Sequence, residues 1–311
     1  MTSPVLITTD LDRTLLFSAR ATAQLGGALP ADPVETLAGE QSSRSAGAEL
    51  CRAARDCLAG LPQHARLCVA TSRSVRRLAR LRLPFPVHYA IAANGGVILI
   101  DGVPEPRWEA RTKRLLAAAA PAEVVRGVLA GSDAALGSLG SLGSLGSLGP
   151  RGSLGSGRGA SGSAAYGGPP WLVRMGDADD MCCMAIVDLA LFGADEYAAI
   201  AHLCRDLGWE ASLVGRKLYA FPAGFGKEHA AEHVAERVAS LAGAAPRRLA
   251  AGDTEHDRRM LADADLAWVP AGSELAAAGG PDLVITRQPG HAAAAQITSE
   301  WLRYCSDGGV A

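Results

Sequence analysis

Short apolar runs alternate with amphipathic segments along most of the chain. Five of these runs read as buried strands and cover residues 4–9, 67–70, 88–93, 248–251 and 282–285. Apolar runs of this length are typical of parallel strands that are covered on both faces. Apolar residues at helical spacing predict helices over 46–60, 74–82, 227–241 and 256–262. This alternation indicates an α/β fold in which crossover helices connect parallel strands.

The middle of the chain departs from this pattern. Residues 131–168 are dominated by Gly, Ser and Leu, with the triplet Gly-Ser-Leu repeated in tandem. Such a segment buries too little surface to offset its backbone entropy, so we interpret it as a flexible low-complexity insert. Its leucines leave a binding role open.

The residues after this insert predict a second, smaller α/β unit. The pattern favours a strand at 181–189, a helix at 197–207 and one or two strands at 211–221. We therefore expect a discontinuous core domain, residues 1–96 and 222–311, into which a second domain is inserted at 97–221.

Composition narrows the class of partner. The formal net charge is −2, so no basic excess indicates nucleic acid or an anionic membrane surface. The seven cysteines are odd in number and form no C-x-x-C pair, which favours a reducing compartment, and we expect a cytoplasmic protein. No apolar run approaches the roughly 18 residues of a membrane span, and the N-terminus lacks the basic start of a signal peptide. The sequence predicts no oligomeric state.

Two acidic residues directly follow the first predicted strand. Asp10 and Asp12 lie in the string Asp-Leu-Asp-Arg-Thr. Residues two apart in a strand face the same side, and open α/β sheets bind ligands beyond the carboxyl ends of their strands. One carboxylate could attack phosphorus while the other transfers protons. A helix cap or a turn uses the same residue types, so this motif alone does not distinguish a catalytic pair from a structural turn.

Two further motifs place hydroxyl and cationic groups where they could bind phosphate. Thr71-Ser72-Arg73 follows the strand at 67–70, and a hydroxyl there, with the backbone N–H groups of the next helix, could cradle a phosphate. Lys227 begins a predicted helix, where it could keep a carboxylate nucleophile ionised and neutralise phosphate charge. Either motif alone could be a helix cap or a solvated helix start.

The fourth motif again contains two carboxylate residues. Asp253 and Asp257 occur in Gly-Asp-Thr-Glu-His-Asp after the strand at 248–251, and they share one side if the turn between them is helical. A carboxylate from this strand and one from the first strand would suit Mg²⁺, which prefers oxygen ligands.

In this order the motifs resemble those of the haloacid dehalogenase (HAD) superfamily. Asp-Leu-Asp-Arg-Thr, Thr71, Lys227 and the Gly-Asp-x-x-x-Asp string at 252–257 are similar to motifs one to four of that superfamily. Asn94-Gly95 is similar to a signature of its Cof-type, sucrose-phosphate-phosphatase-like subfamily, which inserts a C2 cap between motifs two and three. The resemblance implies a Rossmann-like parallel-sheet core with an inserted α+β cap.

The resemblance also implies an activity and a set of roles. The expected enzyme is a Mg²⁺-dependent phosphatase that hydrolyses a small phosphorylated metabolite, such as a sugar phosphate, through an aspartyl-phosphate at Asp10. Asp12 would be the acid and base and would bind the metal through its backbone carbonyl. Asp10 and Asp253 would ligate the metal by carboxylate, Asp257 would support them, and Thr71 and Lys227 would hold the phosphate. Polar residues expected near the substrate are Thr14, Ser72, Arg73, Asn94, Gly95, Arg216 and Lys217.

The sequence departs from the superfamily pattern at two positions, and other functions are also compatible with it. Arg13 and Ser72 stand where Gly is commonest in the superfamily, which affects the loops near the substrate. A phosphomannomutase-like mutase and a non-catalytic phospholigand-binding protein are alternative functions. His229-Ala-Ala-Glu232-His233 also fits the H-x-x-E-H pattern of zinc proteases, for which a solvated helix face is the competing interpretation.

Overall fold

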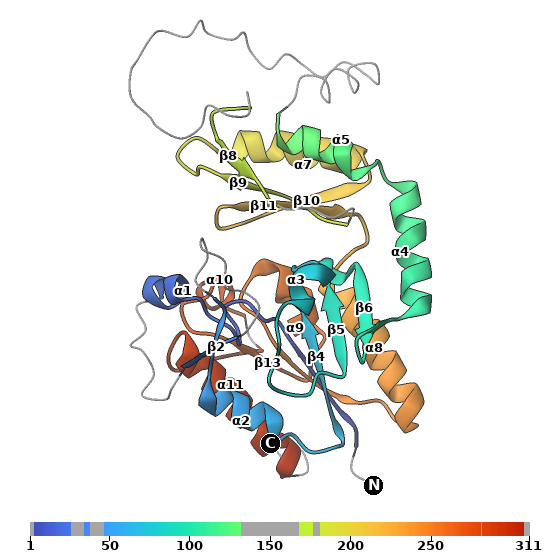
Figure 1. Ribbon diagram of the computed structural model, residues 1–311, viewed down its shortest axis with the longest axis vertical. Coiled ribbons are helices and arrows are strands. Elements are labelled where there is room, and N and C mark those ends of the chain that lie inside the picture. Colours follow the sequence, from blue (N-terminus) through green and yellow to red (C-terminus); the bar gives the residue numbers. More distant parts are fainter. Residues whose placement is uncertain are drawn as a thin grey trace, which may run out of the picture. The chain divides into compact units, whose positions relative to one another are not determined.

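The computed structural model describes residues 3–25, 34–37, 47–131, 168–176, 181–280 and 282–307 (Figure 1). The Gly-Ser-Leu segment predicted to be an insert lies outside these residues, apart from its two ends. The chain divides into two units. Unit 1 comprises Met1–Thr112 and Gly224–Ala311, and unit 2 comprises Lys113–Ala223.

Unit 1 contains an eight-stranded sheet in the order β14-β13-β12-β1-β4-β5-β6-β7. Strands β14 to β5 in this order pair in parallel, whereas β6 and β7 are added antiparallel. The central strand β1 is buried along its whole length, as its apolar sequence predicts. The strands are β1 Val5–Thr9, β4 Ala65–Ala70, β5 Tyr89–Ala92, β6 Val97–Ile100, β7 Val103–Pro104, β12 Arg247–Ala251, β13 Leu266–Val269 and β14 Leu283–Ile285.

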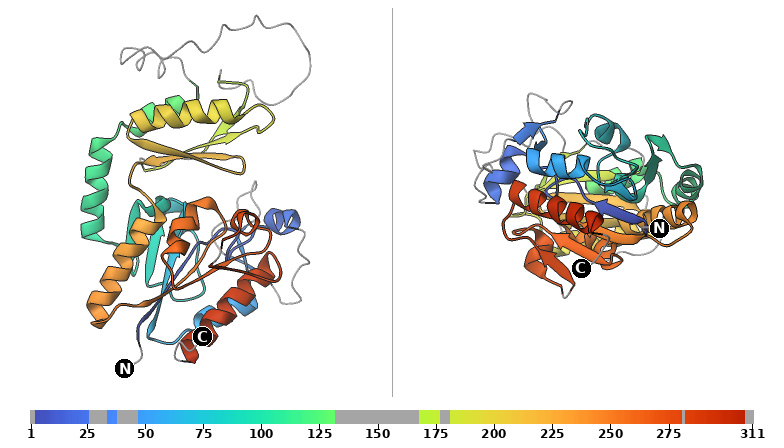
Figure 2. Two further views of the ribbon diagram at one scale, coloured as in Figure 1. Left: turned by 180° about the vertical axis from the view of Figure 1, so that it is seen from behind. Right: turned by 90° about the horizontal axis from the view of Figure 1, so that it is seen from below.

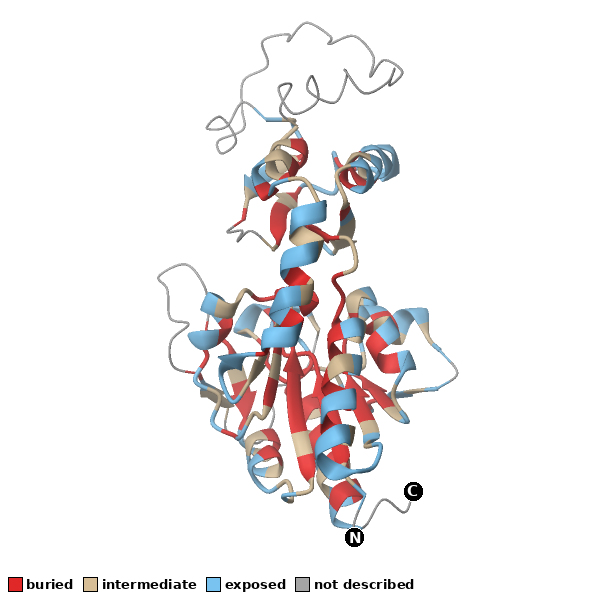
Figure 3. Ribbon diagram, turned by 90° about the vertical axis from the view of Figure 1, so that its right-hand side faces the viewer, coloured by how far each residue is buried: buried red, intermediate tan, exposed pale blue. Residues whose placement is uncertain are grey.

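Helices cover both faces of this sheet (Figures 2 and 3). Ile7 of β1 packs in a core with α2 and α11, whereas its neighbour Leu6 belongs to a second core with α8 and α9. Successive strand residues point to opposite faces, so an apolar run supplies both cores. These helices are α2 Arg52–Ala59, α8 Lys227–Ala242, α9 Arg258–Ala262 and α11 His291–Ser306. Shorter elements of unit 1 are α1 Ala19–Gln24, β2 Val34–Thr36, β3 Glu49–Cys51, α3 Val75–Ala79, η1 Ala93–Gly95, η3 Glu255–Asp257 and α10 Glu274–Ala278.

Unit 2 is a separate α+β layer. Its four antiparallel strands follow the order β10-β11-β9-β8, and helices α5 and α7 pack on one face of them (Figure 1). The elements are α5 Ala122–Leu129, β8 Leu172–Met175, β9 Cys183–Val187, α7 Ala194–Asp206, β10 Trp209–Val214 and β11 Lys217–Pro222. Helix α4, Pro106–Ala118, runs across the boundary between the units.

The predicted fold class is confirmed, with two local corrections. The helix predicted over 46–60 begins only at Arg52, because residues 49–51 form β3 and pair with β2. Residues 97–112, which we expected in the inserted domain, group with unit 1, because β6 folds back on β5 and extends the large sheet. The first correction arises from the pairing of β3 with the separate segment β2, and the second from a hairpin of β5 and β6; local periodicity reveals neither pairing.

Two further observations concern the chain as a whole. Among the described helices, none has the length and apolar character needed to cross a membrane. All seven cysteines are free thiols, and six of them are buried. The cytoplasmic location and the absence of a nucleic-acid partner stay predictions.

Candidate active site

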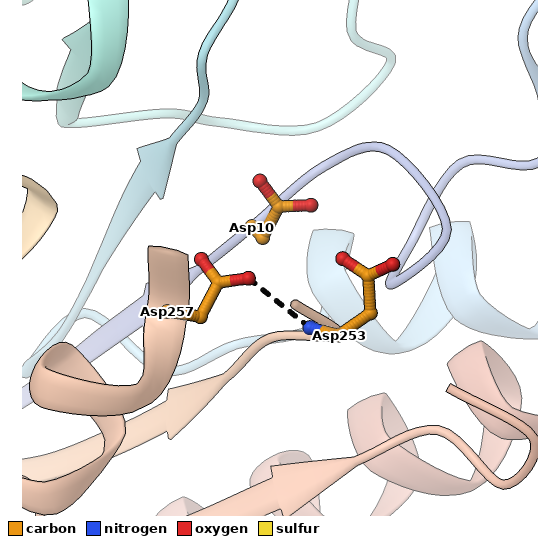
Figure 4. A group of neighbouring side chains, drawn as sticks. All are labelled: Asp10, Asp253 and Asp257. Carbon is orange, nitrogen blue, oxygen red and sulfur yellow. Dashed lines mark hydrogen bonds between the residues drawn. The ribbon is translucent and has the colours of Figure 1, made fainter. Parts of the chain in front are cut away.

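Strands β1 and β12 end side by side, and the acidic residues that follow them converge. Thr9 pairs with Ala251 in parallel register, and the Asp10 amide donates a hydrogen bond of 2.9 Å to the Ala251 carbonyl. One carboxylate oxygen from each of Asp10, Asp253 and Asp257 lies within 4.8 Å of the others, and all three residues are buried. Figure 4 shows the three side chains gathering from separate elements of unit 1.

A buried cation contacts this cluster. Lys227, only 2% exposed, donates from Nζ to Asp10 Oδ1 at 2.5 Å and to Asp257 Oδ1 at 2.7 Å. Burial raises the pKa of Asp10 to about 7, although the positive charge of Lys227 opposes the rise. Burial would lower the pKa of Lys227, but the two carboxylates outweigh it and hold that pKa above its ordinary value. The Lys227 ammonium therefore stays charged between them.

Asp257 is engaged at both carboxylate oxygens. Oδ1 accepts from Lys227, and Oδ2 accepts from the backbone N–H groups of Asp253 and Thr254 at 3.2 and 3.1 Å and from the Thr254 hydroxyl at 3.2 Å. Gly252 is required beside it, because a Cβ there would lie 2.4 Å from Asp257 Cβ. Asp257 thus fixes the 253–257 turn and the position of Lys227.

Asp253 differs from Asp257. Its carboxylate accepts no hydrogen bond from any described residue, and burial, followed by the charges of Asp10 and Asp257, raises its pKa well above the ordinary value. Buried carboxylates with excess negative charge and unengaged oxygens suit a hard cation that prefers oxygen ligands. The residues present therefore fit a site for Mg²⁺, formed by Asp10 and Asp253 and supported by Asp257.

Asp12 points to a different partner. Arg73 donates from Nε to Asp12 Oδ2 at 2.7 Å and from Nη2 to Asp12 Oδ1 at 2.5 Å, so the guanidinium binds both oxygens. The Arg73 side chain is 8% exposed, whereas that of Asp12 is 45% exposed. The Arg73 backbone N–H donates to the hydroxyl of Thr71 at 3.1 Å, which fixes the loop after β4. The sequence did not predict this ion pair.

The loop after Asp12 has an unusual backbone. Arg13 has φ 69°, in the left-handed region, and its N–H donates to the Leu16 carbonyl at 2.6 Å. A left-handed conformation costs a non-glycine residue roughly 1–2 kcal/mol, which accounts for the Gly commonly found in the motif that this loop resembles. Thr14, the next residue, is fully buried, and its hydroxyl has no hydrogen-bond partner among the described residues.

The Asn94-Gly95 loop positions the start of helix α8. Gly95 has φ 98°, and a Cβ on it would lie 2.2 Å from the carbonyl oxygen of Gly226, the residue before Lys227. Trp108 Nε1 donates to the Gly95 carbonyl at 2.8 Å and fixes the loop from the other side. Asn94 is itself left-handed, with φ 52°, and its buried side-chain oxygen has no partner within the described part of the chain.

This contact gives a stability prediction. We expect Gly95→Ala to cost about 1–3 kcal/mol for the clash with Gly226, in addition to roughly 1–2 kcal/mol for the left-handed backbone. Gly102→Ala is the matched control, because Gly102 has φ 82° with nothing within 4 Å of its Cβ position, so it carries the backbone cost alone. Urea denaturation of both variants measures the difference. Equal losses would show that the approach of Gly95 to Gly226 is not tight.

Two of the predicted substrate residues belong to unit 2, and the H-x-x-E-H string lies on α8. Arg216 is exposed in the β10–β11 turn and Lys217 is exposed at the start of β11, and both stay predicted substrate contacts. His233 pairs with Glu105 at 3.2 Å, while Glu232 pairs with Arg248. Within the described ranges, the three aspartates are the one group that could hold a metal, so the H-x-x-E-H string forms no such site.

Several solved structures similar to this chain are named as phosphatases. One of them is the sucrose-phosphatase of Synechocystis, with a TM-score of 0.58 and 10% sequence identity. The match covers 96% of this chain and 98% of the sucrose-phosphatase chain. The C-terminal domain of trehalose-6-phosphate phosphatase from C. albicans has a TM-score of 0.56 at 10% sequence identity, and the match covers 97% of this chain and 93% of that domain. A phosphatase of the haloalkanoate (HAD) superfamily from Bacteroides thetaiotaomicron has a TM-score of 0.50 at 15% sequence identity, and the match covers 99% of this chain and 97% of that phosphatase.

These comparisons define the class of fold. No family model matches the sequence, and no curated protein sequence matches it. At 10–15% identity the structural likeness shows the fold and no more. The chain therefore has the fold of the HAD-superfamily phosphatases over nearly its whole length, and the predicted resemblance is confirmed at that level.

Proposed function

We propose that this chain is a phosphatase of HAD type that hydrolyses a small phosphate monoester through an aspartyl-phosphate on Asp10. The observation that carries this proposal is the buried contact of Asp10 Oδ1 with Lys227 Nζ. A lysine that stays charged favours the ionised, nucleophilic form of the carboxylate. The second oxygen of Asp10 accepts no hydrogen bond from the described residues, so it is available to attack phosphorus.

The two steps follow from Asp10 and Asp12. Asp10 forms a bond to phosphorus as the ester P–O bond breaks, and Asp12 donates a proton to the leaving oxygen. Asp12 then removes a proton from water, which attacks the phosphorus and releases inorganic phosphate and the free Asp10 carboxylate. In the free chain Arg73 binds both oxygens of Asp12 and so favours its ionised form, the form that removes the proton from water.

A magnesium ion is the proposed cofactor. The carboxylates of Asp10 and Asp253 and the backbone carbonyl of Asp12 would hold it, and Asp257 would keep this turn in place. When bound, the ion neutralises negative charge on the transferring phosphoryl group. The unengaged, buried carboxylate of Asp253 supports this assignment.

A sugar phosphate, or a metabolite of similar size, is the proposed substrate class. Two of the structures of the same fold are named for sucrose phosphate and trehalose 6-phosphate phosphatase activity. Proposed phosphate-binding residues are Thr71 and Lys227. Proposed contacts to the rest of the substrate are Thr14, Ser72, Arg73, Asn94, Gly95, Arg216 and Lys217.

Metal dependence tests this function. We expect the protein to release inorganic phosphate from members of a phosphometabolite panel when Mg²⁺ is present. EDTA should abolish release and Mg²⁺ should restore it, because the acidic cluster repels a phosphate unless a cation offsets its charge. Full activity in metal-free buffer would contradict the site. Exchange between sugar 1- and 6-phosphates without net release would indicate a mutase, and tight ligand binding without turnover would indicate a binding protein.

A further inference from the structure

Among the described residues, three cationic side chains belong to the motifs of the candidate site, and two of them are already engaged. Lys227 is bound between two aspartates, and Arg73 binds both oxygens of Asp12. The third is Arg13, which is exposed and forms no hydrogen bond or ion pair with any described residue through its guanidinium. Arg13 directly follows Asp12 in the loop after β1 and is three residues from Asp10.

The backbone of Arg13 is fixed by its neighbours. Its N–H is bonded to the Leu16 carbonyl, and the residues that follow, Thr14 to Leu16, are each at most 1% exposed. Arg13 therefore starts from a rigid turn, in a left-handed conformation that an L-residue rarely adopts. Strained residues of this kind concentrate at functional sites, and here the strain lies three residues from the proposed nucleophile.

We propose that Arg13 determines specificity by binding a second anionic group of the substrate, carried on the leaving group beside the phosphate ester. The planar guanidinium forms paired hydrogen bonds with a carboxylate or a phosphate, and both are included in the proposed class. A doubly anionic substrate would be repelled by the aspartates unless an unengaged cation received its second charge. This inference rests on the proposed phosphate site.

The binding test compares phosphonates, which are not hydrolysed, by calorimetry with Mg²⁺. Ethylphosphonate carries one anionic group, phosphonopropionate adds a carboxylate, and propane diphosphonate adds a second phosphonate. We expect the wild-type chain to bind one or both doubly anionic compounds about 10- to 100-fold more tightly than ethylphosphonate, as suits a charge-assisted contact. The favoured compound identifies the group as carboxylate or phosphate.

Variants at position 13 then assign the preference. Arg13→Met keeps a long side chain and the strained backbone but removes the charge, so the preference should fall to near unity, whereas Arg13→Lys should retain part of it. Arg13→Gly should also lose it while raising the melting temperature, which separates binding from folding. The matched control Arg20→Met alters an exposed arginine of α1 and should keep the full preference. A preference that survives in Arg13→Met, or that is absent from the wild-type chain, would overturn the inference.

Turnover distinguishes this inference from the function on which it rests. The same variants are assayed with the substrate pairs glycerol phosphate and phosphoglycerate, and fructose monophosphate and bisphosphate. Phosphate release without an Arg13-dependent preference in the binding test refutes the role of Arg13 and retains the phosphatase. An Arg13-dependent binding preference without any phosphate release refutes the phosphatase and retains the second anion site.

Discussion

Asp10→Asn is expected to reduce phosphate release to the uncatalysed background and to prevent a phosphoenzyme from forming. The asparagine keeps the size of the side chain and an acceptor for Lys227, but its amide is not a competent nucleophile. Enzymes accelerate phosphate-monoester hydrolysis by up to ~10²¹-fold, so loss of the covalent route should remove nearly all measurable activity. The measurements are phosphate release from p-nitrophenyl phosphate and the intact mass of the protein after a short incubation with Mg²⁺.

The same substitution two residues along is the matched control. Asp12→Asn should slow turnover by ~10²–10⁴-fold, the usual contribution of general acid–base catalysis. With acetyl phosphate, whose leaving group needs no proton, this variant should still be phosphorylated and then hydrolyse slowly. An adduct of one phosphoryl group should therefore accumulate on Asp10. An adduct on Asp12 would reverse the two roles, and normal turnover by Asp10→Asn would exclude covalent catalysis.

The location of these residues at one edge of the sheet could be predicted because buried parallel strands are recognisable from their apolar runs. Asp10, Thr71 and Asp253 each closely follow such a run, and β1 pairs with both β4 and β12. Strands that lie side by side and run in the same direction bring their following loops together. The pattern thus predicted that these residues follow strand ends, and the resemblance in the order of the motifs indicated that their loops meet.

The choice of ion-pair partners could not be predicted in the same way. Spacing does not reveal that Lys227 lies between Asp10 and Asp257 or that Arg73 binds Asp12. These contacts depend on loop conformations, such as the close approach of Gly95 to Gly226, which join segments far apart in the chain. The departure at Arg13 was visible in the sequence, but its left-handed backbone and unengaged guanidinium required the structure.

Lys227→Met is expected to destabilise the fold and abolish turnover. Removing one partner of a buried ion pair costs about 3–5 kcal/mol, because the remaining charge is left without compensation. Here two carboxylates would remain within the cluster, Asp10 at 5% exposure and Asp257 at 0%. The loss should appear as a lower midpoint in urea denaturation, measured in EDTA so that no cation replaces the lysine.

This loss should grow as the pH rises. In the wild-type chain the pKa of Asp10 is already raised from 3.8 to about 7 by burial. A carboxyl group whose folded pKa lies above its unfolded value contributes stability that is complete below the unfolded pKa and is lost as the pH rises through the folded one. Without the opposing charge of Lys227, the pKa of Asp10 in the folded state moves higher still. The deficit of Lys227→Met relative to wild type should therefore be larger at about pH 8 than at about pH 5.

A double variant shows whether charge is the cause. Asp10→Asn alone removes a partner of Lys227 and should leave stability unchanged or lower, but in the Lys227→Met background it removes an uncompensated carboxylate and should restore stability. This reversal of sign is a coupling that only interacting residues show, on the order of 0.5–3 kcal/mol. If Asp10→Asn has the same effect in both backgrounds, Lys227 and Asp10 do not compensate each other, and the contact on which the proposed nucleophile depends is not formed in solution.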